Sequence, residues 1–201
     1  MLLADISGYT AFMQAVAQAH AEDMIAGTFV PRAYPLLASL LDGIVGRVAP
    51  PFSLSKLEGD AVFGFADDED LRLRGDGFLG CLATCYEAYR ASLEEARGLM
   101  TCDCAACSSV EDLDLKFVVH YGDYIIQSVA GRQELLGPHV TVVHLLMKNH
   151  VTDHIGRSPY ALFTEAAARH LEIPLQQATS IDESYEHYGT IQTSVLTLPF
   201  K

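Results

Sequence analysis

Positive charge is scarce in this chain: its 201 residues include 13 Lys and Arg against 26 Asp and Glu, and the formal net charge is −13. Proteins that bind nucleic acid or anionic membranes without a specific site concentrate Lys and Arg to neutralise phosphates. We therefore expect no binding to nucleic acid or to a membrane surface. Any phosphate ligand must be held by local devices, namely metal ions, backbone N–H groups and a few placed cations.

Long apolar runs are also lacking. No stretch of 18 or more consecutive apolar residues occurs, so the sequence predicts no membrane span. The apolar N-terminus is too short for a signal peptide and lacks a basic start, and we expect a cytoplasmic protein. Because 50% of the residues are hydrophobic, the chain can bury a substantial core. We expect one domain over residues 1–201.

What the sequence does contain is a short apolar run that leads into a helix start within the first ten residues. Asp5 stands at the end of this run, a Ser7-Gly8 turn follows, and an amphipathic helical pattern begins. A carboxylate at a strand end can hold a divalent cation, while the free N–H groups of the helix start hold a phosphate. The alternative is a simple cap, in which Ser7 or Thr10 starts the helix and Asp5 favours its dipole.

The rest of the chain alternates predicted hairpins with long helices. Glu58-Gly59-Asp60 and Gly122-Asp123 are the predicted hairpin turns. This order is typical of an α+β sheet with helices on one face, close to a ferredoxin-like core. Helices are predicted over residues 9–20, 21–46, 70–98, 137–153 and 164–171, and strands over the opening run and residues 52–57, 61–65, 113–120, 124–129, 160–163 and 191–198.

Four segments, in chain order, resemble the successive motifs of class III nucleotidyl cyclases: residues 4–10 (ADISGYT), 56–61 (KLEGDA), 120–123 (HYGD) and 136–141 (LGPHVT). The Cys-x-Cys-x-x-Cys segment and a Leu-Met-Lys-Asn helix also resemble a divergent bacterial branch of this superfamily, whose members are mostly of unknown function. The resemblance implies an α+β, ferredoxin-like fold of the cyclase type, with long helices packed on an antiparallel or mixed sheet.

The resemblance also implies a metal site. In such cyclases two aspartates, one after the first strand and one in the following hairpin, bind two divalent ions, Mg²⁺ or Mn²⁺. These ions activate the ribose 3′-hydroxyl and hold the triphosphate during an in-line displacement at the α-phosphate. The matching positions here are Asp5 and Asp60, with the Ile6 carbonyl as an extra ligand. The β- and γ-phosphates would then lie against the backbone N–H groups of Ser7, Gly8, Tyr9 and Thr10.

Two further positions resemble the base-reading residues of these enzymes. Lys56 stands where adenylyl cyclases place a lysine that selects adenine. Glu134 falls where the family places a second base-reading side chain, often Asp or Thr. Without the flanking motif, Lys56 would be taken as an outward-facing strand lysine. The resemblance implies a nucleoside triphosphate substrate, with ATP favoured.

The fourth predicted helix departs from the family pattern. Where the family carries a transition-state Asn and, four positions further on, an Arg, this chain has Thr141 and Leu145. Loss of one such electrostatic stabiliser costs on the order of 10²–10³ in rate. His144 or Lys148 could substitute from the same helix, and together with Thr141 they are the candidate catalytic residues.

Three of the five cysteines, Cys102, Cys104 and Cys107, stand within six residues of one another. The odd total and this spacing favour reduced thiols or a metal site over a disulfide framework. The triplet could supply three thiolates to a structural Zn²⁺ ion, which needs a fourth ligand from Cys81, Cys85 or a partner chain. The alternative is a reduced loop beside small core residues.

Two functions follow as hypotheses. The first is a divergent, metal-dependent nucleotidyl cyclase, a phosphorus–oxygen lyase that works as a head-to-tail homodimer. One chain would give the metal aspartates and the other the residues of the fourth helix. The second is a catalytically silent nucleotide-binding or structural homodimer with the same fold. Asp5 and Asp60 favour retained metal–nucleotide binding, whereas Thr141 and Leu145 favour lost or altered catalysis.

Overall fold

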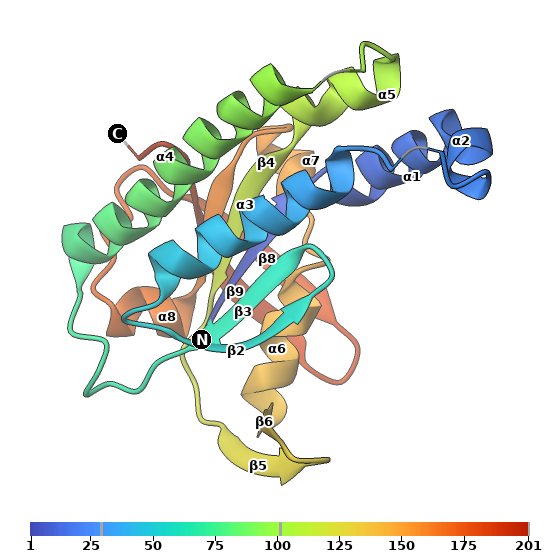
Figure 1. Cartoon of the computed structure of the whole chain (residues 1–201). Coiled ribbons are helices and arrows are strands. Elements are labelled where there is room, and N and C mark those ends of the chain that lie inside the picture. Colours follow the sequence, from blue (N-terminus) through green and yellow to red (C-terminus); the bar gives the residue numbers. More distant parts are fainter. Residues whose placement is uncertain (29, 101, 201) are drawn as a thin grey trace.

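A computed structural model describes residues 1–28, 30–100 and 102–200 of the chain. Its centre is a seven-stranded mixed sheet in the order β2-β3-β1-β4-β7-β9-β8 (Figure 1). Neighbouring strands run antiparallel, except that β4 and β7 are parallel. The strands are β1 (Leu2–Ser7), β2 (Ser53–Glu58), β3 (Ala61–Phe65), β4 (Asp114–Val119), β7 (Tyr160–Thr164), β8 (Thr179–Tyr185) and β9 (Gly189–Thr197).

Helices cover both faces of this sheet. Alternate residues of β1 point to opposite faces, so Leu2 and Ile6 join an apolar cluster with α1, α3, α4 and α8, whereas Leu3 joins a second cluster with α6 and α7. The helices are α1 (Tyr9–Ala19), α2 (Ala21–Ile25), α3 (Ala33–Val48), α4 (Gly75–Leu99), α5 (Ala105–Ser108), the 3-10 helix η1 (Ser109–Asp112), α6 (Pro138–Leu146), α7 (Val151–Ile155) and α8 (Glu165–His170). The predicted α+β fold is confirmed, but the prediction of helices on one face only is wrong.

The predicted hairpin between residues 113–120 and 124–129 is also wrong. β4 pairs with β1 and β7 inside the sheet, whereas β5 (Ile125–Val129) leaves the sheet and pairs with β6 (Arg132–Leu136) as a separate projecting hairpin (Figure 1). Gly122 does not turn the chain back; a Cβ atom there would lie 2.4 Å from the ring of His139. This glycine therefore lets the chain pass close to that ring.

Two predicted long helices are divided. The prediction over residues 21–46 becomes α2 and α3, because Gly27 adopts a φ of 67° and Pro31 cannot continue a helical hydrogen-bond ladder; Phe29 lies outside the described residues. The prediction over residues 137–153 becomes α6 and α7. Asn149 separates them, because its side chain donates to the Leu146 carbonyl at 2.7 Å and accepts the Val151 N–H at 3.1 Å. Among the described residues, no helix combines the length and apolar content needed to cross a bilayer.

Candidate functional site

Asp5 and Asp60 line the same cleft, which has a volume of about 760 Å³. β1 and β3 pair so that Asp5 lies opposite Ala61, the residue directly after Asp60. The Ile6 N–H also donates to the Asp60 carbonyl at 3.1 Å, which ties the β2–β3 turn to the end of β1. The hairpin turn and the strand end are therefore brought together by backbone pairing.

The start of α1 forms one wall of this cleft. Ser7, Gly8, Tyr9 and Thr10 all line it, and Gly8 adopts the left-handed φ of 87° that turns the strand into the helix. The N-cap residue is Gly8, so neither Ser7 nor Thr10 caps the helix as the simpler alternative requires. The first N–H groups of a helix have no partner within the helix, and at this wall they can receive an anion.

Lys116 is a cleft residue that sequence reasoning missed. It lies opposite Asp5 in the β1–β4 pairing, and its Nζ is 3.0 Å from Asp5 Oδ2. Burial has the largest effect on the pKa of Lys116 and acts to lower it, but the negative charges of Asp5, Tyr160 and Asp60 and the hydrogen bond to Asp5 together outweigh burial, and the pKa is raised. The pKa of Asp60 is also raised, first by burial and then by the negative charge of Asp5. The signal in the sequence was a lysine between the apolar residues Leu115 and Phe117.

Lys56 and Glu134 lie together at a second cleft of about 720 Å³. The Lys56 ammonium is 3.1 Å from Glu58 and 3.7 Å from Glu134. Glu58 in turn is 3.1 Å from His144 Nδ1 on α6, and the His144 ring packs against Phe63. Polar contacts thus connect Glu134 to Lys56, Lys56 to Glu58, and Glu58 to the candidate catalytic residue His144. Lys56 and Glu134 are the two positions that resemble base-reading residues.

The other candidate residues around α6 are more exposed. Thr141 lies on the outer face of α6 and its hydroxyl donates to the Gly137 carbonyl at 3.4 Å. Lys148 lies just beyond the end of α6 and is exposed, and Leu145 is half-buried. Thr141, His144 and Lys148 are not among the described residues that line the Asp5 cleft. Within one chain, α6 is instead linked to Lys56 through the contact between His144 and Glu58.

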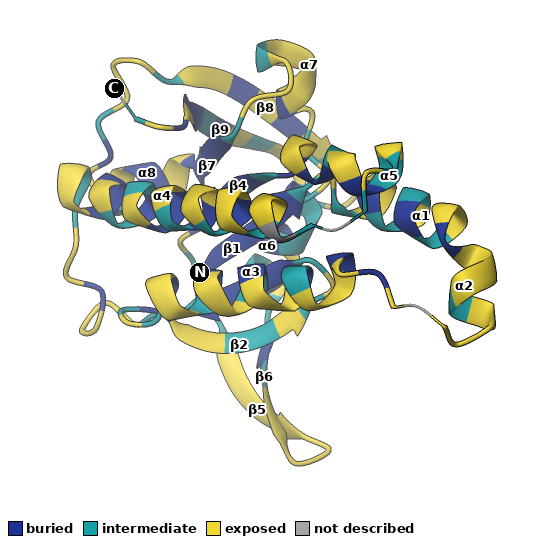
Figure 2. Cartoon of the chain, turned by 45° about the horizontal axis from the view of Figure 1, so that its top comes forward, coloured by how far each residue is buried: buried dark blue, intermediate teal, exposed yellow. Residues whose placement is uncertain are grey.

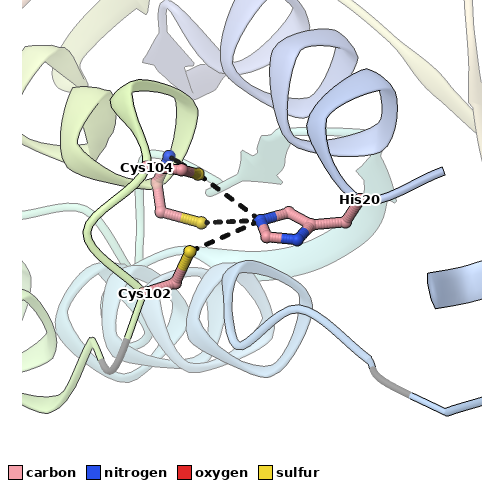
Figure 3. A group of neighbouring side chains, drawn as sticks. His20, Cys102 and Cys104 are labelled. Atoms are coloured by element: carbon pink, nitrogen blue, oxygen red, sulfur yellow. Dashed lines mark hydrogen bonds between the residues drawn. The ribbon is translucent and has the colours of Figure 1, made fainter. Parts of the chain in front are cut away.

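Cys102, Cys104 and Cys107 surround the imidazole of His20 at the end of α1. Their sulfur atoms lie 3.7, 3.5 and 3.4 Å from His20 Nε2, and Figure 3 shows Cys102 and Cys104 directed at the ring. The four ligand atoms all lie within 4.8 Å of one another. This arrangement could hold a metal ion.

The fourth donor beside the cysteine triplet is thus a histidine, whereas sequence reasoning pointed to Cys81, Cys85 or a partner chain. Cys81 and Cys85 are outside this group of described residues and lie on α4, where burial raises the pKa of both thiols. His20 gave no spacing signal, because 82 residues separate it from Cys102.

Solved structures of nucleotidyl cyclases share this fold. The adenylyl cyclase CyaB from P. aeruginosa matches with a TM-score of 0.61 at 11% identity, over 97% of this chain and 91% of that chain. The guanylyl cyclase Cya2 matches at 0.60 and 9%, over 96% and 89%. A bacterial light-regulated adenylyl cyclase matches at 0.58 and 15%, and this chain spans half of its length while 98% of this chain is covered. The chain therefore has the class III cyclase fold, as the sequence predicts.

The sequence itself belongs to a family described as protein of unknown function (DUF2652), which matches residues 37–155. An uncharacterized protein of Mycobacterium tuberculosis, Rv2561/Rv2562, is 30% identical over 165 residues, which are 81% of this chain and 73% of that protein. The chain thus belongs to a family of unknown function and has the fold of the nucleotidyl cyclases.

Proposed function

We propose that this protein binds a nucleoside triphosphate together with two divalent ions, with ATP favoured, and converts it to a cyclic nucleotide. The observation that carries the proposal is the meeting of Asp5, Asp60 and the start of α1 at one cleft. These are the parts that an anionic, metal-bound phosphate chain needs, namely carboxylate ligands and free helix N–H groups.

The carboxylates at the cleft fit a divalent cation. Asp5 is 5% exposed, and its negative charge contributes to the raised pKa of Asp60. Two carboxylates that disfavour each other's charge are stabilised by a cation between them, and carboxylate and carbonyl oxygens suit Mg²⁺ or Mn²⁺. Asp5, Asp60 and the Ile6 carbonyl would hold the ions. When bound, two such ions supply charge stabilisation at the attacking and leaving oxygens.

The protein's own cations complete the phosphate site. Lys116 and Arg157 both line the cleft that the start of α1 also lines. Lys116 is paired with Asp5 in the structure, and we propose that it turns to a phosphate oxygen when the carboxylate binds metal. These two residues would supply part of the positive charge that Leu145 cannot supply.

We further propose that two chains form head to tail, so that the Lys56 cleft of one chain faces the Asp5 cleft of the other. The supporting observation is that the two halves of the expected site lie at separate clefts of a single chain. Much of β2 and β5 is coloured as exposed in Figure 2. Large apolar side chains on β2 and on the projecting β5–β6 hairpin are exposed in this region, as expected of a surface that a second chain covers. These side chains are Leu54, Leu57, Ile125, Ile126, Val129 and Leu136.

The test is to incubate the purified protein with each of the four nucleoside triphosphates and Mn²⁺ or Mg²⁺, and to look for cyclic product by mass spectrometry. Asp5→Asn and Asp60→Asn should each abolish product, whereas Asp42→Asn on the exposed surface of α3 should leave it unchanged. Product that persists in the Asp5→Asn, Asp60→Asn double variant would show that the site is elsewhere.

A second function is favoured by one observation, the aliphatic Leu145 at the position expected to carry an arginine. In that case the protein binds nucleotide and metal without turnover. Equilibrium dialysis with labelled ATP and Mn²⁺ separates the two functions: Asp5-dependent binding without any cyclic product supports the silent module. Absence of both binding and product contradicts both proposals.

A further inference from the structure

Four metal-binding side chains from two distant segments meet on the side of the sheet that carries α1. His20 ends α1 and begins α2, and it is only 9% exposed. Cys102, Cys104 and Cys107 come from the segment around α5, which packs against the end of α1 (Figure 1). The fold therefore brings one imidazole and three thiols together, although His20 and Cys102 are 82 positions apart in the sequence.

The distances between the donor atoms match one tetrahedral ion. Zinc binds a histidine nitrogen at about 2.0–2.1 Å and a thiolate at about 2.3 Å, so nitrogen and sulfur on one edge of the tetrahedron lie ~3.6 Å apart. The three observed separations from His20 Nε2 are 3.4, 3.5 and 3.7 Å. Because all four donors lie within 4.8 Å of one another, they enclose a position for a single ion rather than for a cluster of several metals.

The local structure also suits thiolate ligands. Cys104 is the N-cap of α5, and the Cys107 N–H donates to its sulfur at 3.4 Å. The Cys-x-x-Cys spacing of Cys104 and Cys107 is common in structural zinc sites.

We propose that His20, Cys102, Cys104 and Cys107 bind one Zn²⁺ ion as a structural centre that fastens the end of α1 to α5. Three sulfur donors and one imidazole select zinc over the hard cations expected at the carboxylate cleft. Four protein ligands leave no open position for a substrate, which makes the centre structural rather than catalytic.

The ion would join two walls of the Asp5 cleft. Phe12 and Ala15 of α1 line that cleft on one side, and Ser109 and Asp112, which follow the last cysteine ligand closely, line it on another. A Cβ atom added to Gly8 would lie 3.5 Å from the Asp112 carbonyl, so the two walls already approach each other at the start of α1. Zinc at the other end of α1 would hold their spacing. This inference concerns the cleft walls only and does not require that the cleft binds a nucleotide.

Metal analysis of matched variants tests the ligand set. Protein produced in zinc-supplemented medium and dialysed against a weak chelator should retain about one zinc per chain. Cys104→Ser and His20→Ala should lose most of it, whereas Cys81→Ser on α4 should retain it. His20→Cys should also retain zinc, because four cysteines form an equally complete site. Equal zinc in wild type and Cys104→Ser, no zinc in wild type, or stoichiometric iron in its place would each overturn the proposal.

A second measurement avoids dependence on variants that fail to fold. Chelator-treated wild-type protein titrated with Co²⁺ should develop the visible bands of tetrahedral cobalt and thiolate charge transfer, saturating at about one equivalent and reversed by zinc. The pale spectrum of octahedral cobalt would contradict the site. Hydrogen exchange should then be faster in residues 9–20 and 109–112 without metal, and slow again with zinc, with α3 as the internal reference. Unchanged exchange after zinc loss would overturn the structural role.

Discussion

The ammonium group of Lys116 lies 3.0 Å from Asp5 Oδ2, across the pairing of β1 and β4. The Asp5 side chain is 8% exposed and the Lys116 side chain 18%, so the pair is largely removed from water. In Lys116→Met the Asp5 carboxylate would lose its partner, and we expect a loss of about 3 kcal/mol in the free energy of unfolding. Urea denaturation measures it, with the exposed Lys148→Met as control.

Manganese should restore part of this loss in Lys116→Met, since a divalent ion at the cleft replaces the missing positive charge. In Lys148→Met and wild type the same addition should have a smaller effect. If Lys116→Met is as stable as wild type in the absence of metal, the ion pair contributes nothing and the assignment of Lys116 as the charge partner of Asp5 is wrong.

Gly8 joins β1 to α1 with a φ of 87°, a backbone conformation that is unfavourable for residues with a Cβ atom. Gly8→Ala should therefore lower the free energy of unfolding by about 1–2 kcal/mol. The matched control is Gly80→Ala, because Gly80 lies inside α4 in open space and alanine there should stabilise by about 0.5–1 kcal/mol. Thermal unfolding of both variants measures the difference, and equal shifts would contradict the expected strain at Gly8.

His120 should make the protein less stable in mild acid. Its ring lies between Thr164 Oγ1 at 2.9 Å and His139 Nδ1 at 3.0 Å. Burial, followed by the charges of His139 and the Met1 α-amino group, lowers the pKa of His120 from 6.5 to about 4. As the pH drops, His120 therefore takes up a proton at a higher pH in the unfolded chain than in the folded chain. The His120 contribution to the free energy of unfolding falls as the pH drops from 6.5 to about 4 and changes no further below that.

The His120 contribution should amount to on the order of 2–3 kcal/mol across this range. Urea unfolding of wild type and of His120→Gln at several pH values measures this contribution. The difference between the two proteins isolates His120, because all other titrating groups are present in both. The exposed His154→Gln serves as control and should keep the wild-type dependence. A wild-type slope in His120→Gln would assign the acid sensitivity to other groups.

Local signals predicted the parts of the Asp5 cleft that the backbone builds from short segments. The position of Asp5 near the end of β1 and the Glu58-Gly59-Asp60 turn follow from the pattern within a few residues, and β-pairing then places them together. The pairing of β5 with β6 did not follow, because Gly122 and Asp123 suggest a turn while the close passage of His139 is a property of the folded chain.

Contacts between distant segments were missed for the same physical reason. Lys116 comes to face Asp5 only through the register of β1 with β4. His20 reaches the cysteines only because α1 packs against α5, and nothing in the spacing along the chain encodes that approach. The metal-ligand types were visible in the sequence, whereas the fourth member of the group required the fold.

Lys56 tests the base-reading half of the proposed function separately from stability. Its ion pairs with Glu58 and Glu134 involve a side chain that is 37% exposed, so Lys56→Ala should change the free energy of unfolding by less than about 1 kcal/mol. The preference for ATP over the other nucleoside triphosphates should nevertheless fall. Competition binding in the presence of Mn²⁺ measures this preference, and an unaltered preference would remove Lys56 from the site.

Mixing two variants that are damaged in different halves of the site, with the activity of each variant alone as the baseline, tests whether one site is built from two chains. Asp5→Asn damages only the metal half of the proposed site and Lys56→Ala only the base half. If the halves meet head to tail, random pairing of an equal mixture makes half of the dimers mixed, and each mixed dimer contains one intact site. About a quarter of the wild-type activity should then return. A mixture of Asp5→Asn with Asp60→Asn, which damages the same half in both chains, should stay inactive. If cyclic product forms in wild type but neither mixture recovers it, each chain contains a whole site and the head-to-tail arrangement is wrong.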